Sequence, residues 1–361
     1  MSEKFPRSTF IEESKIQGHS DDFIRLTLEY IDRLEHNGLP VIFSLKHLGT
    51  ILDIDVKVLK EYTQNRDRYY GRFKLRKKRG GYREIRVPNA QLKTIQYWIQ
   101  QKILSKVSPS LCSTAFYPGS SIYNNAARHL AQESVLSIDL FRFFDSITNR
   151  RIYKIFKSMG YHSNVAVDLA RLCTVGTHYL TPLDGNLLNR LPDGFPIYED
   201  VLPQGAPTSP ILANLAARKL DQRLFKLSEK LGVTYSRYAD DLTFSGDKNQ
   251  IPRLKLIYKI IHDEGFFVNH SKTRQRNIGQ KQLVTGLVVS GDKVRVQKSY
   301  KKDIWKHLYY CKKFGVAKHA EYFGHSFFSE WLLGRIFFVK SIEPDVGENM
   351  LQAYNELDWA F

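Results

Sequence analysis

Apolar and basic side chains alternate along residues 66–86, on both sides of a Gly80-Gly81 pair. Alternation with a period of two is typical of β-strands, and the glycine pair favours a tight turn. The pattern therefore predicts a β-hairpin that carries aromatic rings and positive charge. Such a hairpin is suited to holding phosphates and stacking on bases. The alternative is an edge hairpin whose charges protect it from aggregation.

Two further segments have the pattern of strands and end in acidic residues. Residues 133–140 form an apolar run that ends in Asp139. Residues 233–246 contain two β-forming runs around Asp240-Asp241, which predicts a hairpin with the acidic pair in its turn. The pair Asp21-Asp22 has an ordinary explanation by contrast. It follows Ser20 at a predicted helix start, where the helix dipole stabilises acidic side chains.

A period of three to four residues predicts helices through much of the remaining chain. One helix is expected within residues 1–38, where Ser20 caps it and Asn37-Gly38 ends it. The others are expected at 44–48, 56–64, about 90–107, around Phe143, Phe144 and Ile147, at 164–175, after Pro210, at 252–264 and in the C-terminal region. Strands are expected near 283–297 and a basic amphipathic helix within 293–313. Residues 181–200 are rich in Pro, Gly, Asn and Asp and are predicted to be a surface insertion.

Charge and composition narrow the function classes. The 361 residues carry 54 Lys+Arg against 37 Asp+Glu, a net charge of +17, which favours a polyanionic partner. Nucleic acid is the first candidate, an anionic membrane surface the second, and a basic but otherwise ordinary globular protein is the alternative. No apolar stretch reaches 18 residues, and the polar start of the chain does not resemble a signal peptide. Three scattered cysteines indicate neither a disulfide scaffold nor a zinc site, so we expect a cytoplasmic protein.

The acids at positions 139, 240 and 241 indicate metal chemistry. Adjacent acids in an apolar, β-forming neighbourhood are costly unless a cation compensates their charge. One acid from a strand end and two from a hairpin would supply the carboxylates that two divalent ions need. Mg²⁺ prefers such oxygen ligands together with substrate phosphates, which points to in-line phosphoryl transfer. A turn with ordinary solvated acids is the alternative.

Four motifs resemble those of reverse transcriptases and occur in that family's order. Tyr238-Ala239-Asp240-Asp241 is similar to the catalytic motif. Residues 202–210 resemble the Leu-Pro-Gln-Gly…Ser-Pro loop, residues 137–145 the first palm motif, and residues 265–273 a later palm motif that ends in Lys-Thr.

Two more motifs resemble the retron-type bacterial reverse transcriptases in particular. Residues 125–129 fit the Asn-Ala-x-x-His pattern, and residues 284–286 fit the Val-Thr-Gly pattern that precedes the thumb. The resemblance covers about residues 39–315. The leader, the insertion at 181–200 and the last 45 or so residues lie outside it.

The resemblance implies an α+β fold of the right-hand polymerase type, with fingers, palm and thumb. In this division residues 1–38 are a leader with a helix, 39–132 are fingers, 133–282 are a palm interleaved with fingers, and 283–361 are thumb and a C-terminal helical region. The palm would contain an antiparallel sheet with packed helices.

The resemblance also implies roles for single residues. Asp139, Asp240 and Asp241, together with Leu140, would hold two Mg²⁺, and Lys272 would protonate the leaving pyrophosphate unless it is a plain surface lysine. Arg83, Phe143, Phe144, Gln204 and Gly205 would bind the incoming nucleotide. Phe144 would be the steric gate against a ribose 2′-hydroxyl, with Phe143 competing for that position, and Arg83 would otherwise be generic charge. The implied nucleic-acid contacts are Arg72, Lys74, Arg76, Lys77, Lys78, Arg79, Asn125, His129, Thr285, Gly286, Lys298, Lys301 and Lys302.

Two of these motifs keep a structural alternative. A lone histidine such as His129 is more often a satisfied structural residue than a ligand, and its motif would then be an extension packed on the palm. The Val-Thr-Gly run is otherwise a strand with a glycine kink.

The resemblance implies that a structured non-coding RNA is both template and primer. Synthesis would start from an internal guanosine 2′-hydroxyl, consume dNTPs, pass through an RNA–DNA hybrid and leave a branched RNA–DNA product, msDNA. It further implies a role in defence against phage with an associated effector protein, and no membrane. The alternatives are another bacterial reverse transcriptase, such as a group II intron maturase, a catalytically silent RNA-binding scaffold, and a basic membrane-surface protein.

Overall fold

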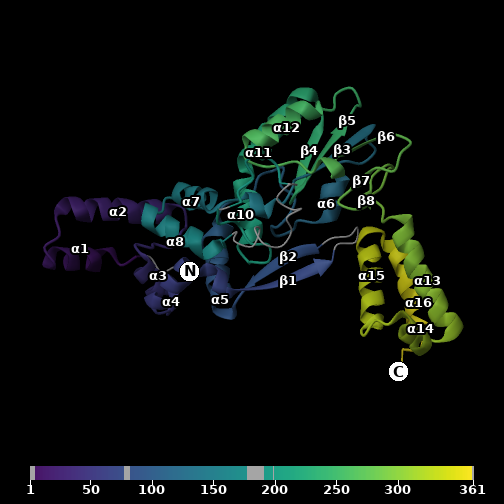
Figure 1. Ribbon diagram of the computed structural model, residues 1–361, viewed down its shortest axis with the longest axis horizontal. Helices are drawn as coiled ribbons and strands as arrows, with labels where there is room; N and C mark the ends of the chain where they lie inside the picture. Colours follow the sequence, from purple (N-terminus) through teal and green to yellow (C-terminus); the bar gives the residue numbers. More distant parts are fainter. Residues whose placement is uncertain (1–4, 77–81, 177–190, 198, 360–361) are drawn as a thin grey trace. The chain divides into compact units, whose positions relative to one another are not determined.

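The computed structural model describes residues 5–76, 82–176, 191–197 and 199–359. The chain folds into two compact units, each assembled from separate stretches of sequence (Figure 1). Unit 1 comprises Met1–Tyr117, Leu140–Arg223 and Lys255–Val268, and unit 2 comprises Pro118–Asp139, Leu224–Leu254 and Asn269–Phe361.

Unit 1 begins with four helices: α1 (Arg7–Ile16), α2 (Asp21–His36), α3 (Leu45–Leu52) and α4 (Val56–Gln64). The predicted cap of α2 is confirmed, because the Ser20 hydroxyl accepts a hydrogen bond from the Phe23 backbone N–H. The prediction of one helix within residues 1–38 was incomplete, since α1 precedes α2. Helix α1 buries only Ser14 and lacks an apolar stripe that would reveal it in the sequence.

The basic hairpin is confirmed in unit 1. After the short turn η1 (Arg66–Tyr69), strands β1 (Tyr70–Arg76) and β2 (Tyr82–Pro88) pair antiparallel. Its large apolar side chains Phe73, Leu75 and Tyr82 are exposed. Lys77, Lys78, Arg79 and the predicted Gly80-Gly81 turn lie outside the described residues.

Two helix predictions in unit 1 had wrong bounds. The helix expected at 90–107 is α5 (Ala90–Lys102), and the chain then turns through η2 (Leu104–Lys106), where Ile103 and Leu104 are fully buried. The helix expected around Phe143, Phe144 and Ile147 is a single turn, η3 (Phe144–Ser146), and the helix α7 (Asn149–Ser158) starts after it. Packing of Phe143 and Ile147 into the core, rather than helical periodicity, explains that apolar run.

A third helix prediction, at 44–48, ended too early, because α3 extends to Leu52, and the one helix expected after Pro210 is divided into α10 (Ser209–Ala216) and α11 (Arg218–Leu231). Helix α8 (Ser163–Cys173) covers the predicted 164–175 segment, and α10 has Pro210 in its first turn. Helix α11 runs from unit 1 into unit 2, and α12 (Leu254–Asp263) follows the acidic hairpin.

Only part of the predicted insertion at 181–200 can be described, because residues 181–190 and 198 lie outside the described residues. Of its described residues, Phe195 is buried and packs with Phe267, Phe141 and Leu191. The end of this segment is therefore anchored in the apolar interior of unit 1, where one of its contacts, Phe141, follows Asp139 by two residues in the sequence.

Unit 2 contains a four-stranded antiparallel sheet with the order β4-β5-β3-β6 (Figure 1). Its strands are β3 (Ser134–Asp139), β4 (Thr234–Tyr238), β5 (Asp241–Gly246) and β6 (Arg274–Asn277). The strand at 133–140 and the hairpin at 233–246 are confirmed. Strand β6 was missed because its four residues are all polar and show no apolar alternation.

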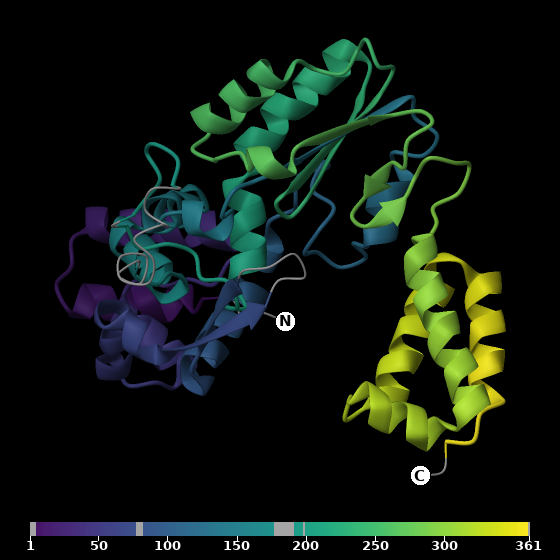
Figure 2. The same cartoon turned by 45° about the vertical axis from the view of Figure 1, so that its right-hand side comes forward.

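The rest of unit 2 contributes to one apolar core, and its C-terminal helices lie side by side (Figure 2). The short helix α6 (Ile122–Ala127), which was not predicted, and strands β7 (Leu283–Val284) and β8 (Leu287–Val288) contribute to this core. The predicted C-terminal helical region is confirmed, and Ile304, Leu308 and Cys311 form its first buried stripe. Its helices are α13 (Lys298–Phe314), α14 (Val316–Phe323), α15 (Phe328–Ile342) and α16 (Pro344–Asn355).

These elements confirm an α+β protein with antiparallel sheets. The division into leader, fingers, palm and thumb stays a prediction. Within the described residues, none of the helices is both long enough and apolar enough to cross a bilayer.

Candidate active site

Asp139 and Asp241 lie directly opposite each other on neighbouring strands of unit 2. They are partners in the antiparallel register of β3 and β5. Leu136 and Ile138, which precede Asp139 in β3, are fully buried, so Asp139 lies where a core strand ends. Two acids far apart in the sequence are thus brought together by strand pairing.

The turn between β4 and β5 carries the third acid. Tyr238 pairs with Asp241, which leaves Ala239 and Asp240 as the two turn residues. Ala239 has φ +56°, a left-handed conformation that is strained for a residue with a Cβ atom. The fully buried Arg237 donates a hydrogen bond to the carbonyl oxygen of Ala239 and so supports this turn. No local sequence pattern singles out Arg237.

The electrostatics of this edge favour a bound cation. The pKa of Asp241 is raised to about 7, first by loss of water around its carboxylate and then by the carboxylates of Asp240 and Asp139, while Lys272 acts in the opposite direction. A positive ion beside the three acids would remove the repulsion that holds this proton.

Asp139 is held by two residues of the segment that precedes β6 in unit 2, Asn269 and Lys272. Its Oδ1 accepts from Lys272 Nζ at 2.6 Å, and its Oδ2 accepts from Asn269 Nδ2 at 3.0 Å. The backbone N–H of Asn269 also donates to the Asp139 carbonyl oxygen at 2.8 Å. The structure thus brings the predicted Lys272 to the acids. It also places Asn269 there, through a contact across 130 residues that no local sequence pattern reveals.

The chemistry of these residues suits Mg²⁺, although their present arrangement is not a finished metal centre. No group of three or more His, Cys, Asp or Glu side chains in the described ranges is arranged to hold a metal ion. The oxygens of Asp139 are instead engaged with Lys272 and Asn269. Three carboxylates at one sheet edge are still the hard oxygen donors that Mg²⁺ prefers, and the raised pKa of Asp241 is the mark of an uncompensated acid cluster. Leu140, the fourth residue predicted to bind metal, follows Asp139 in the sequence. It is buried and belongs to unit 1.

Gln204 and Gly205 lie against the base of the basic hairpin in unit 1. The Gln204 carbonyl oxygen accepts from the Arg86 backbone N–H at 2.8 Å. Gly205 has φ +128°, and a Cβ atom there would lie 2.7 Å from the Arg86 carbonyl oxygen. Only glycine fits this approach. Arg83 lies in the same strand as Arg86, nearer the turn of the hairpin, and is exposed.

Phe143 and Phe144 differ in their surroundings. Phe143 is buried, 3% exposed, and packs on Phe266 with ring centroids 5.5 Å apart. Phe144 is half-buried and touches Phe116 at a centroid distance of 6.4 Å. Phe144 therefore keeps surface that a ligand could touch, whereas Phe143 is committed to the core.

Asn125 and His129 are inside unit 2. Their exposed fractions are 1% and 0%, so neither side chain is on a surface that nucleic acid could touch in this structure. His129 Nε2 and Nδ1 lie 2.7 Å from the hydroxyls of Ser236 on β4 and Ser245 on β5, respectively. Ser236 in turn donates to Asn125 Oδ1 at 2.7 Å. Burial lowers the pKa of His129 to about 3, with Arg128 as a smaller cause, so the ring is neutral.

Comparison with known proteins identifies the family. A family model described as reverse transcriptase (RNA-dependent DNA polymerase) matches residues 75–326. The retron Ec86 reverse transcriptase of Escherichia coli is 33% identical over 300 residues, which are 81% of this chain and 87% of that protein. The chain belongs to the retron-type reverse transcriptases. The predicted resemblance and the right-hand polymerase fold class are thereby confirmed.

Two further similarities complete the comparison. The retron Mx65 reverse transcriptase of Myxococcus xanthus is 38% identical over 264 residues, which are 72% of this chain and 61% of that protein. Among solved structures, the telomerase of Candida albicans covers 82% of this chain and 59% of its own, with 12% identity and a TM-score of 0.41.

The Val-Thr-Gly motif of this reverse transcriptase forms the turn between β7 and β8. Thr285 and Gly286 have φ values of +47° and +83°, as expected for the two central residues of a type I′ hairpin turn. The Thr285 hydroxyl donates to the Ile122 carbonyl oxygen of α6 at 3.1 Å, and Gly286 is exposed. The tip of the turn is thus accessible, while the threonine side chain is used inside unit 2.

The basic residues of the reverse transcriptase fall into two classes. In the described part of the hairpin, Arg72, Lys74 and Arg76 are exposed, and so are Lys298 and Lys302 of α13. Lys301 differs, because its ammonium group lies 2.8 Å from Glu343 of unit 2 and is largely buried there. The exposed set carries positive charge on the surface, whereas Lys301 holds α13 to the start of α16.

Proposed function

We propose that this reverse transcriptase copies a structured non-coding RNA into DNA, starting from an internal guanosine 2′-hydroxyl and leaving a branched RNA–DNA molecule. The observation that carries the polymerase part is the strand register that sets Asp139 opposite Asp241, with Asp240 at the adjoining turn. The retron relatives support RNA as the partner. The branch, the role in phage defence and an associated effector protein are parts of the proposal.

The three acids would hold the two Mg²⁺ ions of the reaction. When bound, these ions supply activation of the attacking hydroxyl and neutralisation of the triphosphate. Lys272, 2.6 Å from Asp139, is near enough to this edge to deliver a proton to the departing pyrophosphate. Asn269 fixes the orientation of Asp139 through its backbone and its side chain.

Residues of unit 1 would bind the incoming nucleotide. Arg83 would hold triphosphate oxygens in a two-point contact. Gly205 lets the 202–210 loop lie close to β2, so that Gln204 is fixed beside the hairpin that carries Arg83. The exposed arginines and lysines of the hairpin would hold the RNA–DNA hybrid through its phosphates.

Branched DNA is the direct test of the proposal. The chain is expressed with the non-coding RNA encoded beside it, and small nucleic acids are treated with RNase and then with debranching enzyme. We expect one discrete DNA whose mobility shifts after debranching, and no such DNA when the branching guanosine is replaced. A discrete DNA that debranching leaves unchanged would contradict 2′-priming, and RNA binding without any DNA would support a silent scaffold instead.

The steric gate gives a second test, for which the chain contains its own control. Phe144→Ala should increase ribonucleotide incorporation relative to deoxynucleotide incorporation by roughly tenfold or more, because it removes the ring that would exclude a 2′-hydroxyl. The readout is the ratio of kcat/KM for dGTP and GTP on one primer–template.

Phe143→Ala is the matched control. It should lower the free energy of unfolding by about 3–5 kcal/mol, since Phe143 is a core residue, and leave the sugar preference unchanged. Loss of sugar preference in Phe143→Ala alone would assign the gate to Phe143.

A further inference from the structure

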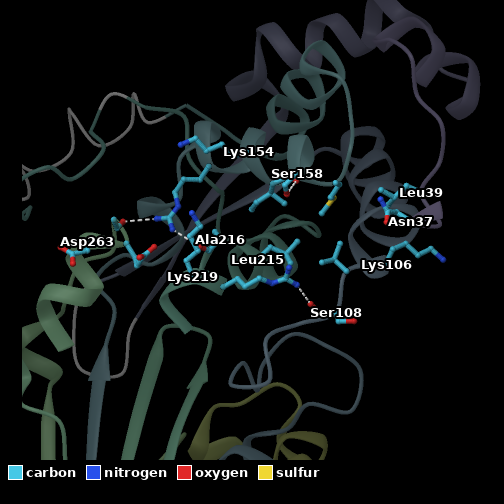
Figure 3. A pocket seen from close by; sticks show the side chains of 17 residues that line it. Asn37, Leu39, Lys106, Ser108, Lys154, Ser158, Leu215, Ala216, Lys219 and Asp263 are labelled. Carbon is cyan, nitrogen blue, oxygen red and sulfur yellow. Dashed lines mark hydrogen bonds between the residues drawn. The ribbon is translucent and has the colours of Figure 1, made fainter. Parts of the chain in front are cut away.

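A cavity of about 880 Å³ lies within unit 1 (Figure 3). It is lined from η2, α7, the C-terminal end of α10, the first turn of α11 and the residues around the end of α12. None of the residues assigned above to catalysis, to nucleotide binding or to nucleic-acid binding lines it. The volume is in the range that proteins use to hold ligands.

The cavity wall is positively charged. Five cationic side chains line it, against the two acids Asp263 and Glu264. Both acids are already paired with Arg223, at 3.0 and 2.9 Å. The cationic residues are Lys106, Arg151, Lys154, Arg218 and Lys219.

Arg151 is a fixed cation in this wall. Its guanidinium donates to the carbonyl oxygens of Ala216 and Gly265, at 2.9 and 3.3 Å, and lies 4.3 Å from the centre of the Phe266 ring. Burial lowers the pKa of Arg151, but from a value so high that the group stays charged. A guanidinium has five N–H groups, and three of those on Arg151 have no acceptor among the described residues. They are available to a ligand in the cavity.

Three lysines surround the same hollow from different elements. Figure 3 shows Lys106 of η2, Lys154 of α7 and Lys219 of α11 around it. All three are exposed, and none forms an ion pair with an acid in the described parts of the chain. Like charges gathered at one concave surface raise the local concentration of anions and are relieved by binding one.

We propose that this cavity binds the sugar–phosphate backbone of the structured RNA, at a place separate from the acid cluster. The inference rests on the proposed function, which supplies the RNA. Arginine suits phosphate because its planar fork contacts two oxygens at once, and lysine adds point charge. No aromatic side chain lines the cavity, so the contact is with phosphate and ribose rather than with stacked bases, and it does not read sequence.

The test compares two triple variants of the full chain. The cavity variant is Lys106→Gln with Lys154→Gln and Lys219→Gln. The control variant is Lys57→Gln with Lys60→Gln and Lys255→Gln, which removes three exposed charges of unit 1 outside the cavity. Binding of the transcribed non-coding RNA is measured from 0.1 to 0.4 M salt, and thermal unfolding of both variants checks that they fold.

We expect the cavity variant to bind the RNA about tenfold or more weakly at 0.1 M salt. The slope of log K against log salt should fall by about 2, since each lost phosphate contact removes roughly 0.7–0.9. The control variant should stay within about twofold. Wild-type RNA carrying 4-thiouridine should crosslink to the peptides that contain Lys154 or Lys219.

Three outcomes would overturn the inference. Equal losses in both variants would mean general surface charge. Unchanged binding by the cavity variant, with tight binding by the wild type, would leave RNA recognition intact and refute only this site. Binding of free AMP that the cavity variant abolishes, with RNA affinity unchanged, would assign the cavity to a nucleotide. Failure of the wild type to bind the RNA would refute the proposed function itself.

Discussion

Asp240→Asn or Asp241→Asn is expected to lower DNA synthesis by roughly 10³-fold or more. Each change keeps the size of the side chain and removes one charge from the cluster that Asp139, Asp240 and Asp241 form at the sheet edge. Asp241 already shows the repulsion in this cluster through its raised pKa of about 7. Without a full set of carboxylates, the two proposed Mg²⁺ ions would lose ligands that an amide does not replace. Primer extension with saturating dNTPs measures the effect.

The other Asp-Asp pair of the chain provides the control for this prediction. Asp22→Asn changes an exposed acid in the first turn of α2 and should leave synthesis within about twofold. Both active-site variants should bind the non-coding RNA as the wild type does, because the acids repel phosphate rather than attract it. Substantial synthesis by the Asp240→Asn, Asp241→Asn double variant would refute the assignment of these acids to the metals.

The acid cluster was predictable because each part of it has a local signature. A strand that ends in an acid and a hairpin with two acids in its turn are visible in the residue pattern, and antiparallel pairing does the rest. Asn269 and Arg237 have no such signature. The role of Asn269 arises from a contact across 130 residues, and that of Arg237 from a hydrogen bond of its buried guanidinium to the strained turn two residues further on.

The errors in secondary structure have physical causes of the same kind. Phe143, Phe144 and Ile147 form an apolar run with helical spacing, yet the core takes Phe143 and Ile147 from a turn. Strand β6 is polar throughout and exists because β3 offers it an edge. Helix α1 carries no apolar stripe. For the Phe143–Ile147 run and for β6, tertiary packing outweighed the local pattern, whereas α1 was missed because it has no apolar stripe.

The two retron-specific motifs meet on one short helix. The Asn-Ala-x-x-His motif spans α6 and the turn after it, and its Asn125 and His129 bind the serines of β4 and β5. Thr285 of the Val-Thr-Gly motif binds the first residue of α6. Helix α6 thus joins the β7–β8 turn to the hairpin that carries Asp240 and Asp241. We therefore propose that His129 positions the hairpin that carries Asp240 and Asp241.

The hydrogen-bond directions at His129 fix its tautomer. Ser236 donates its only hydroxyl proton to Asn125 Oδ1. Its oxygen must therefore accept a hydrogen bond from His129 Nε2–H. His129 Nδ1 then accepts from the Ser245 hydroxyl. A proton on Nδ1 would remove that acceptor inside a buried site, which agrees with the pKa of about 3.

His129→Ala should therefore lower the free energy of unfolding by about 2–5 kcal/mol, since it removes the acceptor of the buried Ser245 hydroxyl and the donor to the Ser236 hydroxyl, and opens a cavity. DNA synthesis should fall by roughly 10–10²-fold through displacement of the acidic turn. Urea unfolding and primer extension measure the two effects. The exposed His36→Ala should change the free energy of unfolding by no more than about 0.5 kcal/mol.

The pH dependence separates this role from direct contact with RNA. The unfolded chain protonates His129 near pH 6.5, whereas the folded chain resists protonation down to about pH 3. Its contribution to stability is therefore complete above pH 6.5 and declines as the pH falls from there towards 3. Between pH 7.5 and 5.5 the wild type should lose about 1.4 kcal/mol that His129→Ala does not lose. Weaker RNA binding by His129→Ala with unchanged stability and unchanged pH dependence would instead make His129 an RNA contact, and the buried position of its ring argues against that result.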